Sequence, residues 1–300
     1  MSGSPGRRKI YRSIIGDWPK IDPCYAYRLQ KDGESDEEYA VRSANSLENA
    51  ILEAGAENVA AFFAETVCGA TLGCVTAAPG YFTRVREICD RHDVLLVLDE
   101  VMCGSGRTGS YFAFEQEGVR PDLVTIAKGL GGGYQPLGAM VCRDFIHREI
   151  VEAHGEFAHG HTYVGHATTC AAGVAVQSVL DEENLLENVT TRGRQLQELL
   201  HATFDQHPHV GDIRGRGLFV GIELVKDKVS KQAPDANLGL PGWLKNRAME
   251  EGLICYPGGG TVDGKSGVHI LLAPPFIYST ENVVELVSKL DAILGDVNIA

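Results

Sequence analysis

The sequence predicts a three-layer α/β fold, in which a large domain with a mainly parallel sheet is followed by a smaller α+β domain. Short, continuously apolar segments are typical of strands buried on both faces, and amphipathic segments alternate with them in the first half of the chain. Parallel strands need long crossover connections, so this alternation favours strands joined through helices. A long helical pattern and a mixed final third indicate the smaller domain.

The large domain opens with a polar, turn-rich passage over residues 1–40, which overlaps the start of the first long helix. The following elements are expected in chain order: a helix over 36–54, a strand over 59–65, a helix over 79–93 that begins at a proline, and strands over 94–100, 123–128 and 138–143. From residue 167 the pattern stays helical to residue 204, which predicts two consecutive helices leaving the large domain.

The remainder predicts strands near 212–225 and 268–273 and helices near 240–251 and 279–295. We therefore divide the chain into a cofactor-binding large domain over 1–183 and a small domain over 184–300.

The composition favours a small-molecule partner. A formal net charge of −13 argues against binding to nucleic acid or to anionic lipid, because both depend on clustered Lys and Arg. Eight scattered cysteines without a CxxC pair indicate reduced thiols, and no apolar segment is long enough to cross a bilayer. We expect a cytoplasmic protein without a nucleic-acid or membrane partner and without a metal site.

Three polar residues follow apolar strands and form the candidate site: Glu65, Asp99 and Lys128. Ligands of α/β sheets collect beyond the carboxyl ends of the strands, so we expect these side chains to lie in one cleft. The apolar strand before Asp99 predicts apolar surroundings, which would raise its pKa unless a cation such as a protonated pyridine nitrogen keeps it ionised. Lys128 precedes Gly-Leu-Gly-Gly-Gly, over whose small residues its amine can reach as a nucleophile.

The segments LVTIAKGLGGGYQPLGAMV, VLLVLDEVMCGSGRTG and HGHTYVGHATTCAAG resemble the class III, fold-type I aminotransferases, which depend on pyridoxal phosphate. The resemblance covers nearly the whole chain. It implies that Lys128 holds the cofactor as an imine, that Asp99 faces the pyridine nitrogen, and that Val101 packs on the ring. It also implies that Thr162 hydrogen-bonds the phosphate of the neighbouring subunit in a homodimer. Glu65 matches the glutamate of a Val-Glu-Pro motif in which Thr66 replaces the proline.

Two further positions depart from part of this family. The 4-aminobutyrate and ornithine enzymes carry a glutamate and an arginine, as a pair that gates carboxylate binding, where this chain has Ala70 and Leu271. The departure implies no recognition of 2-oxoglutarate through that pair. It places the chain nearer the omega-amino-acid:pyruvate branch, with an amine or amino-acid donor and a small oxo acid as acceptor.

The resemblance also implies that the chain begins within the family pattern, without the N-terminal segment that cradles the cofactor phosphate. The alternative to an active transaminase is therefore a catalytically impaired fragment or truncated homologue. In that case we expect weak cofactor binding and an exposed apolar patch.

Other motifs indicate competing functions. Residues 259–266 match the phosphate-loop pattern G-x-x-x-x-G-K-[ST], which makes a P-loop ATPase the remote alternative, but a β-type segment follows where a helix is needed. The four histidines between 154 and 166 lie in a Gly-containing connection without a helical metal-binding arrangement. Arg107 and Thr108, in the Gly-Arg-Thr-Gly turn, either support the cleft or serve the turn alone.

Overall fold

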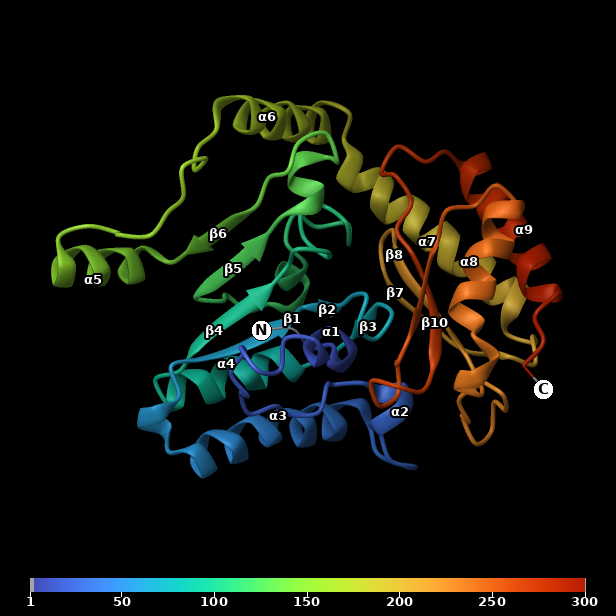
Figure 1. Cartoon of the computed structure of the whole chain (residues 1–300), viewed down its shortest axis with the longest axis horizontal. Helices are drawn as coiled ribbons and strands as arrows, with labels where there is room; N and C mark the ends of the chain where they lie inside the picture. Colours follow the sequence, from blue (N-terminus) through green and yellow to red (C-terminus); the bar gives the residue numbers. More distant parts are fainter. Residues whose placement is uncertain (1–2, 300) are drawn as a thin grey trace.

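The computed structural model describes residues 3–299, which form two four-stranded sheets with helices packed against them (Figure 1). The strands are β1 (Ala61–Glu65), β2 (Val67–Cys68), β3 (Val75–Thr76), β4 (Leu95–Asp99), β5 (Leu123–Ile126), β6 (Ala139–Cys142), β7 (Val210–Arg216), β8 (Phe219–Leu224), β9 (Tyr256–Gly259) and β10 (Val268–Leu272). The α-helices are α1 (Pro5–Lys9), α2 (Ala26–Leu29), α3 (Asp36–Ala54), α4 (Tyr81–Arg91), α5 (Asp144–His154), α6 (Ala167–Glu182), α7 (Leu185–Phe204), α8 (Leu240–Glu250) and α9 (Thr280–Gly295).

The first sheet has the strand order β1-β4-β5-β6. The β1–β4 and β4–β5 pairs are parallel, whereas β6 runs antiparallel to β5. Helices α3 and α4 lie together along one side of this sheet (Figure 1) and share a buried core with β4. The predicted mainly parallel sheet is confirmed, and its parallel strands bring the ends of β1, β4 and β5 to one edge.

Helix α3 shows how local sequence fixes an element. Ser35 caps the helix by accepting from the Glu38 N–H, and Glu38 bonds the Ser35 N–H in return, which satisfies two backbone donors at the start of the helix. The helix ends before Gly55, whose φ of 80° lies in a region that favours glycine. Both bounds agree with the predicted helix over 36–54.

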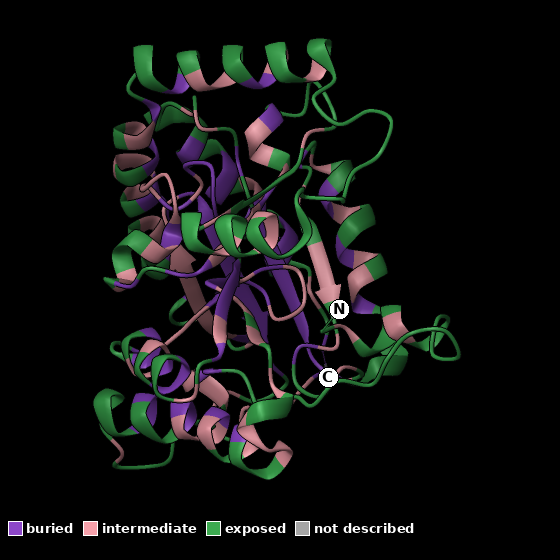
Figure 2. Ribbon diagram, turned by 90° about the vertical axis from the view of Figure 1, so that its left-hand side faces the viewer, coloured by how far each residue is buried: buried purple, intermediate pink, exposed green. Residues whose placement is uncertain are grey.

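The second sheet has the order β7-β8-β10-β9 and is antiparallel throughout. Every residue of β8 and β10 is buried, and the core beside them is built with α7, α8 and α9. Figure 2 shows the buried residues concentrated in the strands at the centre of the molecule. The predicted division at residues 183/184 falls between α6 and α7.

A short hairpin joins the two sheets. Strands β2 and β3 pair next to the end of β1, and β3 lies against β7 of the second sheet. A small apolar cluster at this junction combines Val67 and Cys103 of the first half with Phe219 and Leu271 of the second. The hairpin therefore links the edge of the first sheet to the face of the second.

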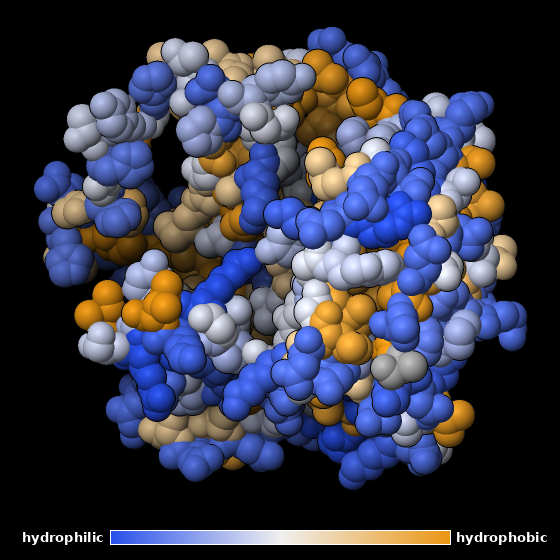
Figure 3. Space-filling view, turned by 45° about the vertical axis from the view of Figure 1, so that its right-hand side comes forward, coloured by the Kyte–Doolittle hydropathy of each residue, from blue (hydrophilic) through white to orange (hydrophobic). Residues whose placement is uncertain are grey.

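Several elements were not predicted from the sequence. Helix α5 projects away from both sheets (Figure 1) and contains no buried residue, so no core contact marks it. Met140 and Val141 on β6 and Phe145 on α5 are exposed. Figure 3 shows apolar side chains among hydrophilic ones, some of them inside a hollow. No helix within residues 3–299 is long and apolar enough to cross a membrane.

Candidate active site

The three predicted site residues lie at neighbouring strand ends of the first sheet. Glu65 and Asp99 are opposite one another in the parallel β1–β4 register, and Asp99 is opposite Thr125 of β5. Lys128 follows the end of β5 by two residues. The parallel arrangement therefore brings two carboxylates and one amine to a single edge, as the sequence indicated.

Asp99 is exposed, contrary to the apolar surroundings expected after an apolar strand. Its Oδ1 accepts a hydrogen bond of 3.0 Å from the Val101 N–H, which fixes the carboxylate, and its other oxygen bonds to no residue from 3 to 299. The expectation failed because Asp99 is the last residue of β4 and is not covered by the core, whereas Glu100, in the turn that follows, is buried. Val101 itself is half-buried directly after this turn.

Lys128 has a free amine and an unusual backbone conformation. Its side chain is exposed, and the amine forms no hydrogen bond or ion pair with any residue from 3 to 299. Its φ of 47° lies in the left-handed region, which is uncommon for a residue with a side chain and recurs at functional sites. The short 3-10 turn Lys128–Gly131 follows, so the lysine stands on glycine-rich backbone.

Glu65 is the half-buried acid of the site. Its Oε2 accepts from the Gly69 N–H at 2.9 Å, and its Oε1 lies 3.5 Å from the Cys68 thiol. Burial raises the pKa of Glu65, the neighbouring Asp99 carboxylate raises it further, and the Lys128 ammonium lowers it. The Glu65 carboxyl therefore experiences opposing electrostatic effects from the two other groups at this edge.

Glu100 is a residue of this region that the sequence did not indicate. It is fully buried, and its carboxylate accepts hydrogen bonds from the Thr66 hydroxyl at 2.8 Å and from the N–H groups of Ala113 and Phe114 at 2.7 and 2.8 Å. Burial raises the pKa of Glu100, although all three hydrogen bonds oppose that rise. Through these hydrogen bonds the Glu100 carboxylate connects the residue after β1 with the segment that begins at Ala113. In the sequence, only the position of Glu100 directly after Asp99 could have indicated that it belongs to this region.

The Gly-Arg-Thr-Gly turn is held by backbone contacts. Arg107 Nη1 donates to the carbonyls of Leu218 at 3.0 Å and Pro274 at 2.5 Å, and its guanidinium lies 4.3 Å from the centroid of the Phe276 ring. Burial lowers the pKa of Arg107 to about 10. The neighbouring Thr108 is buried, and its hydroxyl has no partner within residues 3–299. Arg107 therefore joins the turn to the second sheet.

Thr162 lies apart from these contacts. It occupies an exposed turn in the connection between α5 and α6, and its hydroxyl bonds to none of the residues that the structure describes. The histidines of the same connection form no cluster of three or more metal-ligating side chains with any residue from 3 to 299.

The phosphate-loop pattern is a turn between two strands. Residues 260–267 connect β9 to β10, and Asp263 accepts from the Lys265 and Ser266 N–H groups at 2.8 and 2.6 Å. Because a strand follows, no helix N-terminus meets a phosphate there, which removes the geometric basis of an ATPase. Two cavities of about 480 and 460 Å³ lie beside Tyr27 and beside Tyr278, and neither is lined by Asp99 or Lys128.

The residues present fit pyridoxal phosphate in two respects. The cofactor needs an unpaired amine for its aldehyde carbon and a carboxylate for its ring nitrogen, and Lys128 and Asp99 are such groups at adjacent strand ends. The side chain of Thr162 is exposed.

Comparison with known proteins identifies the family. A family model described as aminotransferase class-III matches residues 4–294. An uncharacterized aminotransferase of Schizosaccharomyces pombe is 46% identical over 294 residues, covering 97% of this chain and 63% of that protein. A diaminobutyrate–2-oxoglutarate transaminase of Halomonas elongata is 36% identical over 281 residues, covering 92% and 58%.

The solved structures that resemble this chain are also transaminases. A transaminase obtained by ancestral reconstruction superposes with a TM-score of 0.90 at 30% identity, covering 98% of this chain and 64% of that one. An (S)-enantioselective omega-transaminase from Thermomicrobium roseum has a TM-score of 0.86 at 34% identity, covering 96% and 63%. The chain thus spans less than two thirds of these relatives. With the family model matched along nearly its whole length, it belongs to the class-III aminotransferases.

Proposed function

We propose that this protein is a pyridoxal-phosphate-dependent transaminase that moves an amino group from an amine or amino-acid donor to a small oxo acid. The observation that carries the proposal is the placement of Lys128, Asp99 and Glu65 at adjoining strand ends of the first sheet. Family membership supports the reaction class.

Each residue has a definite task in this proposal. Lys128 would hold the cofactor through Nζ and, once displaced by the donor, would carry a proton from one carbon to another. Asp99 would keep the ring nitrogen protonated, and its bond from the Val101 N–H aims the carboxylate. The bound cofactor supplies the electron-accepting ring that makes the amino group transferable.

The acceptor is proposed to be pyruvate or a similarly small oxo acid. Leu271 is buried in the apolar cluster at the junction of the sheets, and Ala70 carries no charge, so neither position provides the acid-base pair that gates 2-oxoglutarate in part of the family. The Halomonas relative is named for 2-oxoglutarate, so the acceptor has to be tested directly.

A reducing, cytoplasmic location and a homodimer are also proposed. All eight cysteines are free, which favours a compartment that keeps thiols reduced. The unpartnered hydroxyl of Thr162 supports a contact with a second subunit.

A titration with pyridoxal phosphate tests the proposal. We expect a visible absorbance band that saturates at one cofactor per chain, and amino transfer to pyruvate that exceeds transfer to 2-oxoglutarate. If saturation requires a large excess of cofactor and turnover stays at background, the impaired fragment replaces the active enzyme. A preference for 2-oxoglutarate would overturn the proposed acceptor alone.

A further inference from the structure

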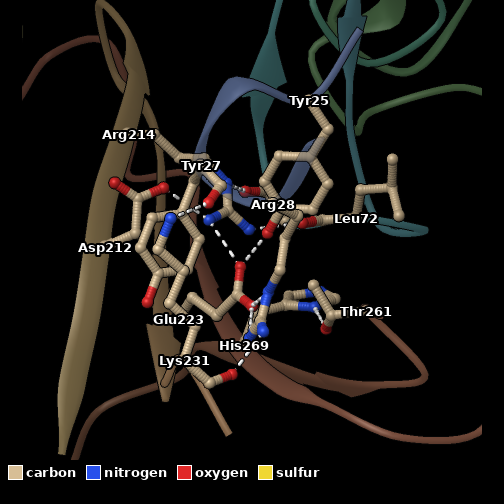
Figure 4. A network of polar contacts seen from close by, with 11 residues as sticks. Tyr25, Tyr27, Arg28, Leu72, Asp212, Arg214, Glu223, Lys231, Thr261 and His269 are labelled. Atoms are coloured by element: carbon tan, nitrogen blue, oxygen red, sulfur yellow. Dashed lines mark hydrogen bonds and ion pairs between the residues drawn. The ribbon is translucent and has the colours of Figure 1, made fainter. Parts of the chain in front are cut away.

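A buried network of charges joins the second sheet to the hairpin beside the candidate site (Figure 4). Arg214 of β7 lies at its centre, with a side chain only 9% exposed. Glu223 of β8 is fully buried and accepts from Arg214 at 2.7 Å, from Arg28 at 2.5 and 2.8 Å, and from the Tyr25 hydroxyl. The two guanidinium groups compensate the buried carboxylate, with Asp212 as a second acid at 2.7 Å from Arg214.

The remaining donors of Arg214 reach the hairpin turn. Its Nη2 donates to the Leu72 carbonyl at 2.6 Å, and its Nε donates to the Gly73 carbonyl at 2.8 Å. The planar, forked guanidinium is suited to holding two adjacent carbonyls and two carboxylates at once, which a lysine ammonium cannot reproduce. Arg214 therefore fixes the backbone of the turn and not merely a side chain.

The turn itself is close to the second sheet. A side chain on Gly221 of β8 would collide with the Gly73 carbonyl, and one on Gly73 would lie 2.6 Å from the His269 ring of β10. Gly73 and the following Cys74 adopt φ values of 72° and 58°, a left-handed conformation that is strained for cysteine. A turn with this backbone needs contacts that hold it, and Arg214 supplies two of them.

The other end of the same turn reaches the candidate site. The Gly73 N–H bonds the Gly69 carbonyl at 2.7 Å, and the Gly69 N–H bonds Glu65 at 2.9 Å. Gly69 also lies against Met102, two residues beyond the Asp99–Glu100 pair, because a side chain there would meet the Met102 sulfur at 2.7 Å. An unbroken series of short contacts thus runs from Arg214 through residues 69–73 to Glu65.

We propose that Arg214 is a positioning residue of the candidate site: it holds the turn 69–74 and, through Gly69, keeps the Glu65 carboxylate beside Asp99 and Lys128. The inference rests on the proposed function for its catalytic meaning, whereas the holding of the turn does not depend on any cofactor.

Three variants separate this role from general stability. Arg214→Gln removes the charge and most of the fork, and Arg214→Lys keeps the charge alone. Arg216→Gln is the matched control, because Arg216 lies on the same strand and pairs with Glu117 of the first half at 2.5 Å without contacting the turn. Amide hydrogen exchange of peptides covering 66–76 is measured first on the cofactor-free proteins.

We expect exchange in 66–76 to be roughly tenfold faster in Arg214→Gln, because two charge-assisted hydrogen bonds are lost, with a smaller increase in Arg214→Lys. Arg216→Gln should leave 66–76 unchanged and affect only the segment around Glu117. If Arg214→Gln does not fold, Arg214→Lys decides the question. Unchanged exchange in 66–76 in a folded Arg214 variant would overturn the proposal.

The second measurement is the pH midpoint of the visible absorbance of the pyridoxal-phosphate complex. Displacing Glu65 alters the charges around Lys128, so the midpoint should move in Arg214→Gln and Arg214→Lys and stay at the wild-type value in Arg216→Gln. An unmoved midpoint in the Arg214 variants contradicts the link to the site. If the wild-type chain shows no such band, the proposed function fails, and the hydrogen-exchange result still decides whether Arg214 holds the turn.

Discussion

The hydroxyl of Thr66 donates a hydrogen bond of 2.8 Å to the buried carboxylate of Glu100. Thr66 directly follows Glu65 at the end of β1, and Glu100 directly follows Asp99 at the end of β4. The bond therefore connects the two segments that continue from the acidic positions of the candidate site. A proline at position 66, as in the motif that this segment resembles, has no hydroxyl to donate. The departure from the motif is therefore part of the structure of this site.

Thr66→Val is expected to destabilise the fold by about 1 to 3 kcal/mol, because it leaves a buried carboxylate short of one donor while conserving side-chain volume. Denaturant unfolding measures the change. Thr125→Val on β5 is the matched control, since the Thr125 hydroxyl forms no hydrogen bond with residues 3–299. Equal stability losses in the two variants would show that the bond to Glu100 contributes nothing specific.

Asp99→Asn should lower the rate of amino transfer roughly 10²-fold to 10³-fold, because a neutral amide cannot keep the ring nitrogen protonated. Single-turnover kinetics with the cofactor bound measure the effect. Asp181→Asn, on the exposed surface of α6, serves as the control. Near-wild-type rates in Asp99→Asn would remove this residue from its proposed task.

Lys128→Ala should abolish the visible band of the cofactor complex and leave the free energy of unfolding within about 1 kcal/mol of wild type, because the exposed amine has no partner within residues 3–299. Absorbance and denaturant unfolding measure the two effects. Lys245→Ala on α8 is the control, since Lys245 is also exposed. A band that survives in Lys128→Ala contradicts the assignment.

Thr162 and Lys128 should complement each other across a homodimer. If Thr162 serves the neighbouring site, a hybrid of one Lys128→Ala chain and one Thr162→Ala chain contains one intact site. Random mixing should then restore about a quarter of the wild-type sites. Activity and sedimentation of refolded mixtures check this. Mixtures that never exceed the separate variants would place Thr162 in its own chain's site or outside any site, and a cofactor-saturated monomer would exclude the dimer.

His269 should make the fold less stable in mild acid. Burial lowers its pKa from 6.5 to about 4, with the nearby Arg214 acting in the same direction. The unfolded chain therefore binds the proton first as the pH falls, and the stability that the neutral His269 contributes is lost between about pH 6.5 and 4. The loss amounts to roughly 2 to 4 kcal/mol. His269→Gln should flatten this slope in unfolding curves measured from pH 4 to 8. A slope as steep as that of wild type would show that His269 is not its source.

The sequence determined the elements whose signals are local. The helix Asp36–Ala54 carries its own capping box, and the apolar strands Leu95–Asp99 and Leu123–Ile126 ended where the polar residues began. Because strand ends in a parallel sheet share one edge, the sequence also placed Glu65, Asp99 and Lys128 together.

Only the tertiary structure decided which of these side chains are buried. The sequence predicted apolar surroundings for Asp99, but its side chain is exposed, while Glu100 in the turn after β4 is buried and bonded to Thr66. The contact of Arg214 with Leu72 and Gly73 spans about 140 residues, and no local pattern encodes it. Such contacts depend on how the two sheets meet, since a charge is buried only where distant segments supply its partners.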